Sequence, residues 1–153
     1  MALTKIPIEL SSTPSIVDGG NATAITIDSN EGVAFSKDIS TSTAGTSNFR
    51  AGVNAGNSIT SGGNLNVLVG DEAGTALTTG DANVAVGYKA LFTEDANGQN
   101  VAVGYNSLMT LNAGAEGNNV AVGFKAGEAV TTGVSNTLIG GLAGDATTTG
   151  THN

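Results

Sequence analysis

Few side chains of this chain could do chemistry, and the acidic ones include two neighbouring pairs. These pairs are Asp71-Glu72 and Glu94-Asp95, and His152 is the single histidine. Catalysis by two carboxylates, or metal binding, needs such groups to converge with a further acid, a histidine or a metal-loop spacing. Neighbours in a strand point to opposite faces, and neither pair has such a partner. We therefore predict no catalytic, cofactor-binding or metal-binding residue and no enzyme, and we expect His152 to be solvated.

Two recurring features could instead bind a ligand. An aromatic residue follows glycine at Tyr88, Tyr105 and Phe124, and such a column either stacks against sugars or packs within or between chains. We interpret the column as packing, and we expect the adjacent Lys89 and Lys125 to be solvated. The pattern Gly-x-x-Ala-Gly could cradle a phosphate, but a phosphate cradle occurs once and opens a helix. Because this pattern recurs, it indicates the corner of a coil.

A repeated phrase must position all of these side chains. The phrase is Asn-Val-Ala-Val-Gly, and the steps between the asparagines of its copies are 18, 17, 17, 19 and 17 residues. A period that short indicates stacked supersecondary units rather than one globular core. The three identical copies are residues 83–87, 100–104 and 119–123, and the looser ones are 66–70, 136–140 and 48–52.

Each repeat predicts one coil of a solenoid. The Val-Ala-Val alternation has the period of a strand, and each glycine inside a helix would cost about 1 kcal/mol relative to alanine. Seventeen extended residues reach ~56–61 Å, enough for one narrow coil, and stacked coils lie ~4.8 Å apart. We predict an all-β, repetitive β-solenoid or β-roll with coils of about 17 residues. In it Val84, Val101 and Val120 form one column, and a short second strand follows each glycine turn.

Other residues of the repeat should also lie in columns. The two extra residues before Asn119 belong in the loop at 112–118, where a solenoid tolerates added length. A column of alanine and serine indicates a tight corner where nothing larger fits. Its members are Ala73, Ala90, Ser107, Ala126 and Ala143.

The chain divides into three parts by pattern. Residues 1–35 predict a small β module, with an edge strand at 6–10 and a hairpin formed by the second half of 21–28 and by 33–35. Residues 36–47 are polar and form a connector, and residues 48–153 form the repeat region. Because Asn153 falls one period after Asn136, we expect the solenoid to continue beyond this residue.

Composition limits the class of partner. Among 153 residues there are 23 glycines, no tryptophan and no cysteine, which excludes disulfide frameworks and thiolate metal sites. The net charge of −8 disfavours nucleic acid and anionic membranes, because neutralising phosphates needs clustered lysine or arginine. No apolar run approaches the roughly 20 residues of a membrane span, and residues 1–10 are interrupted by charge and proline. We expect no membrane insertion and no signal peptide.

Residues 83–91 and 119–127 resemble the head repeats of trimeric adhesins and the similar repeats of bacteriophage tail fibres. Residues 11–15, running into 24–29, are similar to the opening of tail-fibre-like proteins of marine phages. The resemblance implies a homotrimeric fibre in the virion, made in the host cytoplasm. It implies that residues 1–47 dock on tail or adaptor proteins and that distal parts reach a host cell-surface receptor. The unit is longer than an adhesin coil, and no receptor-binding tip is present.

The expected function is therefore that of a structural virion protein, the N-terminal part of a phage tail fibre that links the tail to a receptor-binding region. The alternatives are a bacterial surface adhesin head, a β-helical tailspike that degrades glycans, and an ice-binding solenoid. In the trimer we expect the small face of each strand to point toward the common axis and the acids of the returns to lie outside. The small residues are Ala85, Ala102 and Ala121, and the acids are Asp81, Glu94, Asp95, Glu116 and Asp145.

Overall fold

The computed structural model describes residues 25–27, 33–35 and 44–153, and the chain forms two units, residues 1–39 and 40–153. In the first unit β1 (Ile25–Ile27) pairs antiparallel with β2 (Val33–Phe35), so that Ile25 lies opposite Phe35. The two strands of the predicted hairpin are therefore confirmed. The predicted edge strand at 6–10 lies outside the described residues.

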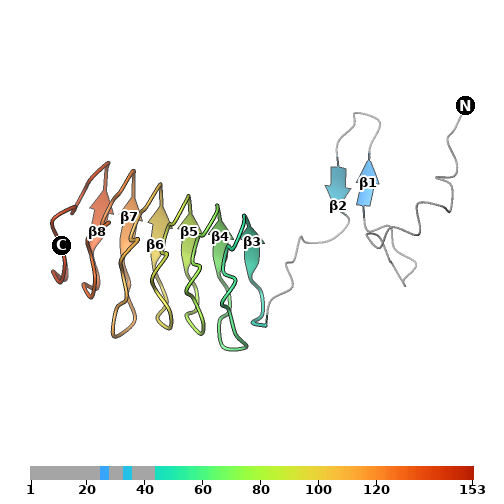
Figure 1. Cartoon of the computed structure of the whole chain (residues 1–153), viewed down its shortest axis with the longest axis horizontal. Coiled ribbons are helices and arrows are strands. Elements are labelled where there is room, and N and C mark those ends of the chain that lie inside the picture. Colours follow the sequence, from blue (N-terminus) through green and yellow to red (C-terminus); the bar gives the residue numbers. More distant parts are fainter. Residues whose placement is uncertain (1–24, 28–32, 36–43) are drawn as a thin grey trace, which may run out of the picture. The chain divides into compact units, whose positions relative to one another are not determined.

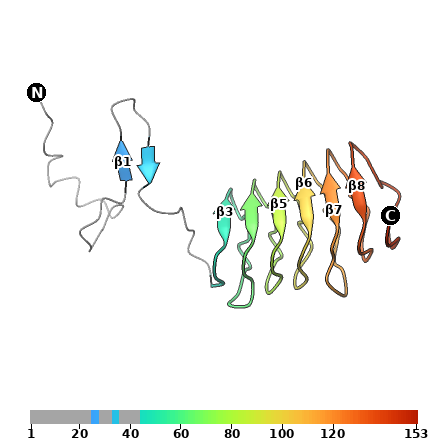
Figure 2. The ribbon, with the colours of Figure 1, turned by 180° about the vertical axis from the view of Figure 1, so that it is seen from behind.

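The second unit is a β-solenoid, as the repeat predicted (Figure 1). Its six strands form one parallel sheet in chain order, and Val84 lies opposite Val101, which lies opposite Val120. Figure 2 shows the same stack from behind, with one strand in every coil. The described residues contain no helix. The strands are β3 (Phe49–Ala51), β4 (Val67–Val69), β5 (Val84–Val86), β6 (Val101–Val103), β7 (Val120–Val122) and β8 (Thr137–Ile139).

The predicted second strand of each repeat is wrong, because a double turn follows the glycine instead. In one coil the N–H of Ala90 donates to the carbonyl of Gly87 at 3.3 Å, and Lys89 between them has φ 52°. A left-handed residue at the third position of such a turn is the arrangement of a type II β-turn. Leu91, two residues later, also has a left-handed φ, 53°. In the preceding coil the N–H of Leu77 donates to the carbonyl of Gly74 at 3.1 Å and forms a second turn. Left-handed backbone at alternate positions cannot continue a strand.

The asparagine that begins each repeat is buried and bonds to the asparagine of the next coil. The Oδ1 atom of Asn100 accepts hydrogen bonds from the backbone N–H and from Nδ2 of Asn119, both at 3.2 Å. The Nδ2 atom of Asn100 also donates to the carbonyl of Gly98 at 3.1 Å. Side-chain amides stacked at strand spacing form such ladders because each amide both donates and accepts. The buried ladder residues are Asn48, Asn66, Asn83, Asn100, Asn119 and Asn136.

The middle residue of each repeat strand points into the coil. The expectation that Ala85, Ala102 and Ala121 face outward is therefore wrong, because all three are fully buried in the core of their own chain. Leucine takes the same position at Leu68 and Leu138, where it is also buried. Since side chains alternate along a strand, the flanking valines must face outward.

The core keeps its volume by exchanging large and small residues between two positions of the coil. Where the strand carries alanine at Ala102, the second turn carries the buried Leu108, six residues later. Where the strand carries Leu68, the turn has Gly74, and a Cβ added there would lie 2.8 Å from the leucine Cδ2. Close packing allows one large side chain at this level of such a coil. At Ala121 the turn residue Gly127 is small as well, and Leu108 and Leu138 of the neighbouring coils take up the space, at 2.8 and 3.0 Å from an added Cβ.

The column of small residues at the corner is confirmed as a closely packed position. Ala73, Ala90, Ser107 and Ala126 are fully buried, and the Ser107 hydroxyl donates to the carbonyl of Ala121 at 3.0 Å. A buried hydroxyl needs such a partner to offset the loss of its water. Serine is therefore accepted where the other coils have alanine.

Candidate functional site

The three aromatic residues form an exposed ladder along one corner of the solenoid. The ring centroids of Tyr88 and Tyr105 lie 5.3 Å apart, and those of Tyr105 and Phe124 lie 5.5 Å apart, with interplanar angles of 23° and 17°. The predicted column is confirmed. Because the spacing is close to the ~4.8 Å between coils, the rings stack along the solenoid. Neighbouring rings thus cover each other's faces, and the ladder presents ring edges to solvent.

At the Phe124 end of the ladder, no further aromatic ring of the described residues stacks on the last one. The exposed fractions of Tyr88, Tyr105 and Phe124 are 41%, 46% and 54%. The next coil carries Gly141 at the aromatic position, 17 residues after Phe124. A Cβ added at Gly141 would have a single near neighbour, the Phe124 carbonyl oxygen at 3.9 Å. The coil that contains Gly141 therefore places no side chain over the Phe124 ring. We call this space, one coil spacing beyond Phe124, the open level.

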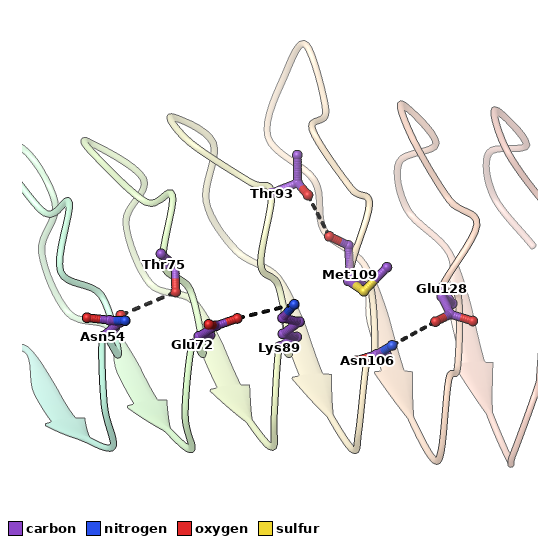
Figure 3. A network of polar contacts seen from close by, with 8 residues as sticks. All are labelled: Asn54, Glu72, Thr75, Lys89, Thr93, Asn106, Met109 and Glu128. Carbon is purple, nitrogen blue, oxygen red and sulfur yellow. Dashed lines mark hydrogen bonds and ion pairs between the residues drawn. The ribbon is translucent and has the colours of Figure 1, made fainter.

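Polar side chains of successive coils form a column of contacts (Figure 3), and its lysines follow the aromatic residues directly in the chain, Lys89 after Tyr88 and Lys125 after Phe124. Lys89 pairs with Glu72 at 3.3 Å, and Lys125 pairs with Glu128 at 3.1 Å. The Nδ2 atom of Asn106 donates to Oε1 of Glu128 at 2.8 Å. The lysines were predicted to be solvated; both lie at the surface, and each also forms an ion pair there. Exposed pairs of this kind contribute little to stability. They matter here because they place ammonium and carboxylate groups at the surface.

These contacts shift two ionisations. The hydrogen bond to Glu72 raises the pKa of Lys89, and the neighbouring Tyr88 hydroxyl adds to the same shift. The hydrogen bond from Asn106 lowers the pKa of Glu128, and Lys125 lowers it further. Both shifts favour the charged forms. Lys89 and Glu128 are therefore held in their charged forms near neutral pH.

The two carboxylates of the first acidic pair, Asp71 and Glu72, contact different neighbouring coils. An Oδ1 atom of Asp71 accepts a hydrogen bond from the backbone N–H of Val53 at 3.1 Å, in the preceding coil. Glu72 pairs with Lys89 in the following coil. The two residues lie in a turn rather than in the predicted strand. Their carboxylates hold neighbouring coils and do not converge on one point.

Glu94 is fully buried, so the expectation that it lies outside is wrong. Its carboxylate accepts hydrogen bonds from the backbone N–H and Nδ2 of Asn97, at 3.2 and 3.1 Å, and from the backbone N–H of Ala113 at 3.1 Å. Burial raises the pKa of Glu94. The Glu94 carboxylate thus joins its own loop to the lengthened loop of the next coil, whose Ala113 N–H points inward. The other four acids of the returns, Asp81, Asp95, Glu116 and Asp145, are exposed as expected.

The described residues hold no group of three histidine, cysteine, aspartate or glutamate side chains that could bind a metal ion. His152 is exposed as expected, and its backbone N–H donates to the Val134 carbonyl at 3.1 Å. In the same part of the chain no helix is long and apolar enough to cross a membrane.

Threonine hydroxyls serve the contacts between coils. The Oγ1 atom of Thr78 donates to the Asp95 carbonyl at 2.9 Å, and that of Thr131 donates to the Thr148 carbonyl at 3.2 Å. An ice-binding face would need a flat, regular array of such groups directed to solvent. Here the hydroxyls of Thr78 and Thr131 bond along the stack, and the coil after Thr78 carries Asp95 in place of threonine.

The outer face of the sheet carries two columns of aliphatic side chains. The first and third residues of β5, β6 and β7 are all valine, and all are partly exposed. None of these strands contains a charged residue. The sequence already held the signal that this face is outward, because leucine replaces alanine only at the middle positions, Leu68 and Leu138. This valine face and the aromatic corner are the candidate interaction surfaces of the solenoid.

No protein-family model matches the chain, and no curated protein or solved structure matches it.

Proposed function

We propose that this chain is a structural segment of a phage tail fibre. The observation that carries the proposal is that buried and surface polar side chains join each coil of the solenoid to the next. The asparagine ladder, the threonine hydroxyls, and Asp71 and Glu94 all make such contacts. A rod held together in this way transmits position and force between its two ends. Connecting a virion to a distal receptor-binding part is a function of that kind.

Residues 1–47 are proposed to attach the fibre to tail or adaptor proteins. Deleting them should leave the solenoid able to fold, because its coils bond to one another through β3 to β8. In a phage that encodes this sequence, the shortened protein should be present in the lysate and absent from purified particles. Mass spectrometry of the particles measures this, and the intact protein is the control. Incorporation of the shortened protein at the normal level would overturn the assignment.

The fibre is proposed to be a homotrimer whose chains meet through the valine face. Three chains together carry a formal charge of −24, three times −8, so a shared interface needs a surface without acids. The valine face meets this condition, and Asp81, Asp95 and Asp145 are exposed on the returns, outside the sheet. Apolar contact is little weakened by salt, whereas repulsion between distant exposed acids is screened beyond about 8 Å at physiological ionic strength.

Replacing Val86 and Val103 together by glutamate should convert the trimer to monomers. Both side chains are partly exposed, so the single chain should keep its fold while the interface gains two acids per chain. Light scattering coupled to size exclusion gives the mass, and circular dichroism reports the fold. Glutamate at the exposed Thr79 and Thr132 adds the same charge elsewhere and should leave the trimer intact. A valine double variant that remains trimeric would exclude this face.

A further inference from the structure

The open level above Phe124 is not explained by the needs of the backbone. Gly141 has no left-handed φ, and a Cβ at this position would lie no closer than 3.9 Å to another residue. The glycines at the turn itself differ in both respects, since Gly123 has φ 140° and faces a carbonyl 2.5 Å from an added Cβ. A larger residue would therefore fit at Gly141. Glycine there leaves one face of the Phe124 ring open.

Along the stack, the open level has the thickness of one aromatic ring. Tyr105 stacks on the other side of Phe124 at 5.5 Å between centroids, and successive coils are spaced by ~4.8 Å. A flat ligand ring could take the place that a fourth aromatic side chain would occupy. It would lie against the Phe124 ring as Tyr105 does on the opposite side.

Polar groups beside the ring indicate the class of ligand. Lys125 Nζ lies over the Phe124 ring, 5.7 Å from its centroid, and pairs with Glu128, so a donor and an acceptor lie at the aromatic surface. A pyranose offers an apolar face of C–H groups for stacking and hydroxyls at its rim for such a pair. An aromatic ligand would leave both polar groups unused. Because Glu128 neutralises Lys125 and the whole chain carries −8, an anionic sugar is disfavoured.

We propose that Phe124, the space over Gly141 and the Lys125–Glu128 pair bind one ring of a neutral saccharide. The proposal is independent of the fibre assignment, because it uses only the side chains of two neighbouring coils. The opposite end of the ladder is a poorer site, because Asp71 occupies the corresponding position next to Tyr88. A single stacked ring with a few hydrogen bonds gives weak affinity, so we expect millimolar binding.

Saturation-transfer NMR of the whole chain with methyl β-D-glucopyranoside and methyl α-D-mannopyranoside tests the site. We expect transfer to the ring C–H protons of at least one pyranoside. Gly141→Tyr should fill the open level and weaken that binding by about tenfold or more. Gly114→Tyr is the matched control, since Gly114 is exposed and an added Cβ meets nothing within 4 Å, and binding should be unchanged.

A second variant, Phe124→Leu, keeps apolar volume but removes the ring, and it should lose binding as well. Circular dichroism checks that each variant is folded. Equal transfer to the parent chain and to folded Gly141→Tyr would overturn the proposal, as would no transfer from the parent chain to either pyranoside. Phenol serves as an aromatic probe, and binding of phenol at this level without either pyranoside would overturn the saccharide assignment.

Discussion

Replacing Gly104 by alanine should strongly destabilise the solenoid. Gly104 has φ 139°, a conformation essentially limited to glycine, and an added Cβ would lie 2.2 Å from the carbonyl oxygen of Gly123 in the next coil. The backbone strain and the separation of two coils should together cost about 3–5 kcal/mol. In thermal unfolding we expect the midpoint to fall by roughly 10 °C or more.

Gly114→Ala is the matched control for this prediction. Gly114 is exposed in the lengthened loop, has no left-handed φ, and has nothing within 4 Å of an added Cβ. Its stability should change by no more than about 0.5 kcal/mol. Hydrogen exchange of the β6 and β7 amides gives a second measurement, because the strain should act between these coils. Similar midpoints for the two variants would mean that the coils can separate locally without loss of stability.

The period of the repeat was enough to predict the stacking of the coils. Asparagines spaced by 17 to 19 residues predicted one coil per repeat and the column of Val84, Val101 and Val120, both of which the parallel register confirms. Register could be predicted because identical phrases align only when each lies over the next. The aromatic column followed from the same argument.

The side of the strand that faces inward could not be predicted from the Val-Ala-Val phrase by itself. Alternation shows that valine and alanine lie on opposite faces, and hydrophobicity favours valine as the inner one. At Ala85 and Ala102 the narrow coil reverses this, because its interior also receives Leu91 or Leu108 from the turn and leaves space only for alanine. The combination of Leu68 with Gly74 also indicates that the middle residue of the strand faces inward. This can be inferred only when the two positions are known to face each other.

Glu94 was misplaced for a different reason. A carboxylate in a polar return is normally exposed, and no sequence pattern indicates that the N–H of Ala113, in a loop lengthened by two residues, points inward. The buried acid is explained only by three donors that converge from two coils. Such a local arrangement depends on the path of the loop.

The repeat pattern shows the position of the asparagines but does not show that their side chains form a hydrogen-bonded ladder. Each coil begins with a buried amide that accepts from the backbone of the next coil and donates to a backbone carbonyl, as Asn119 donates to Gly133 at 3.0 Å. Valine columns would tolerate a slip of one coil against the next, because their contacts have no direction. The amide ladder does not tolerate it, since a displaced amide leaves buried donors and acceptors without partners. The ladder thus determines the register, and the apolar columns supply contact area.

Replacing Asn100 by alanine should therefore cost about 2–4 kcal/mol, although the exchange removes only a few atoms. The buried N–H of Asn119 would lose its acceptor, whereas the Gly98 carbonyl would keep its bond from the N–H of Gly117. Asn112→Ala is the control, because Asn112 is exposed in a loop and bonds to the Thr131 carbonyl through its backbone. Urea unfolding compares the two variants, and hydrogen exchange should locate the loss of protection at the start of β7. If Asn100→Ala is no less stable than Asn112→Ala, the valine columns alone determine the register.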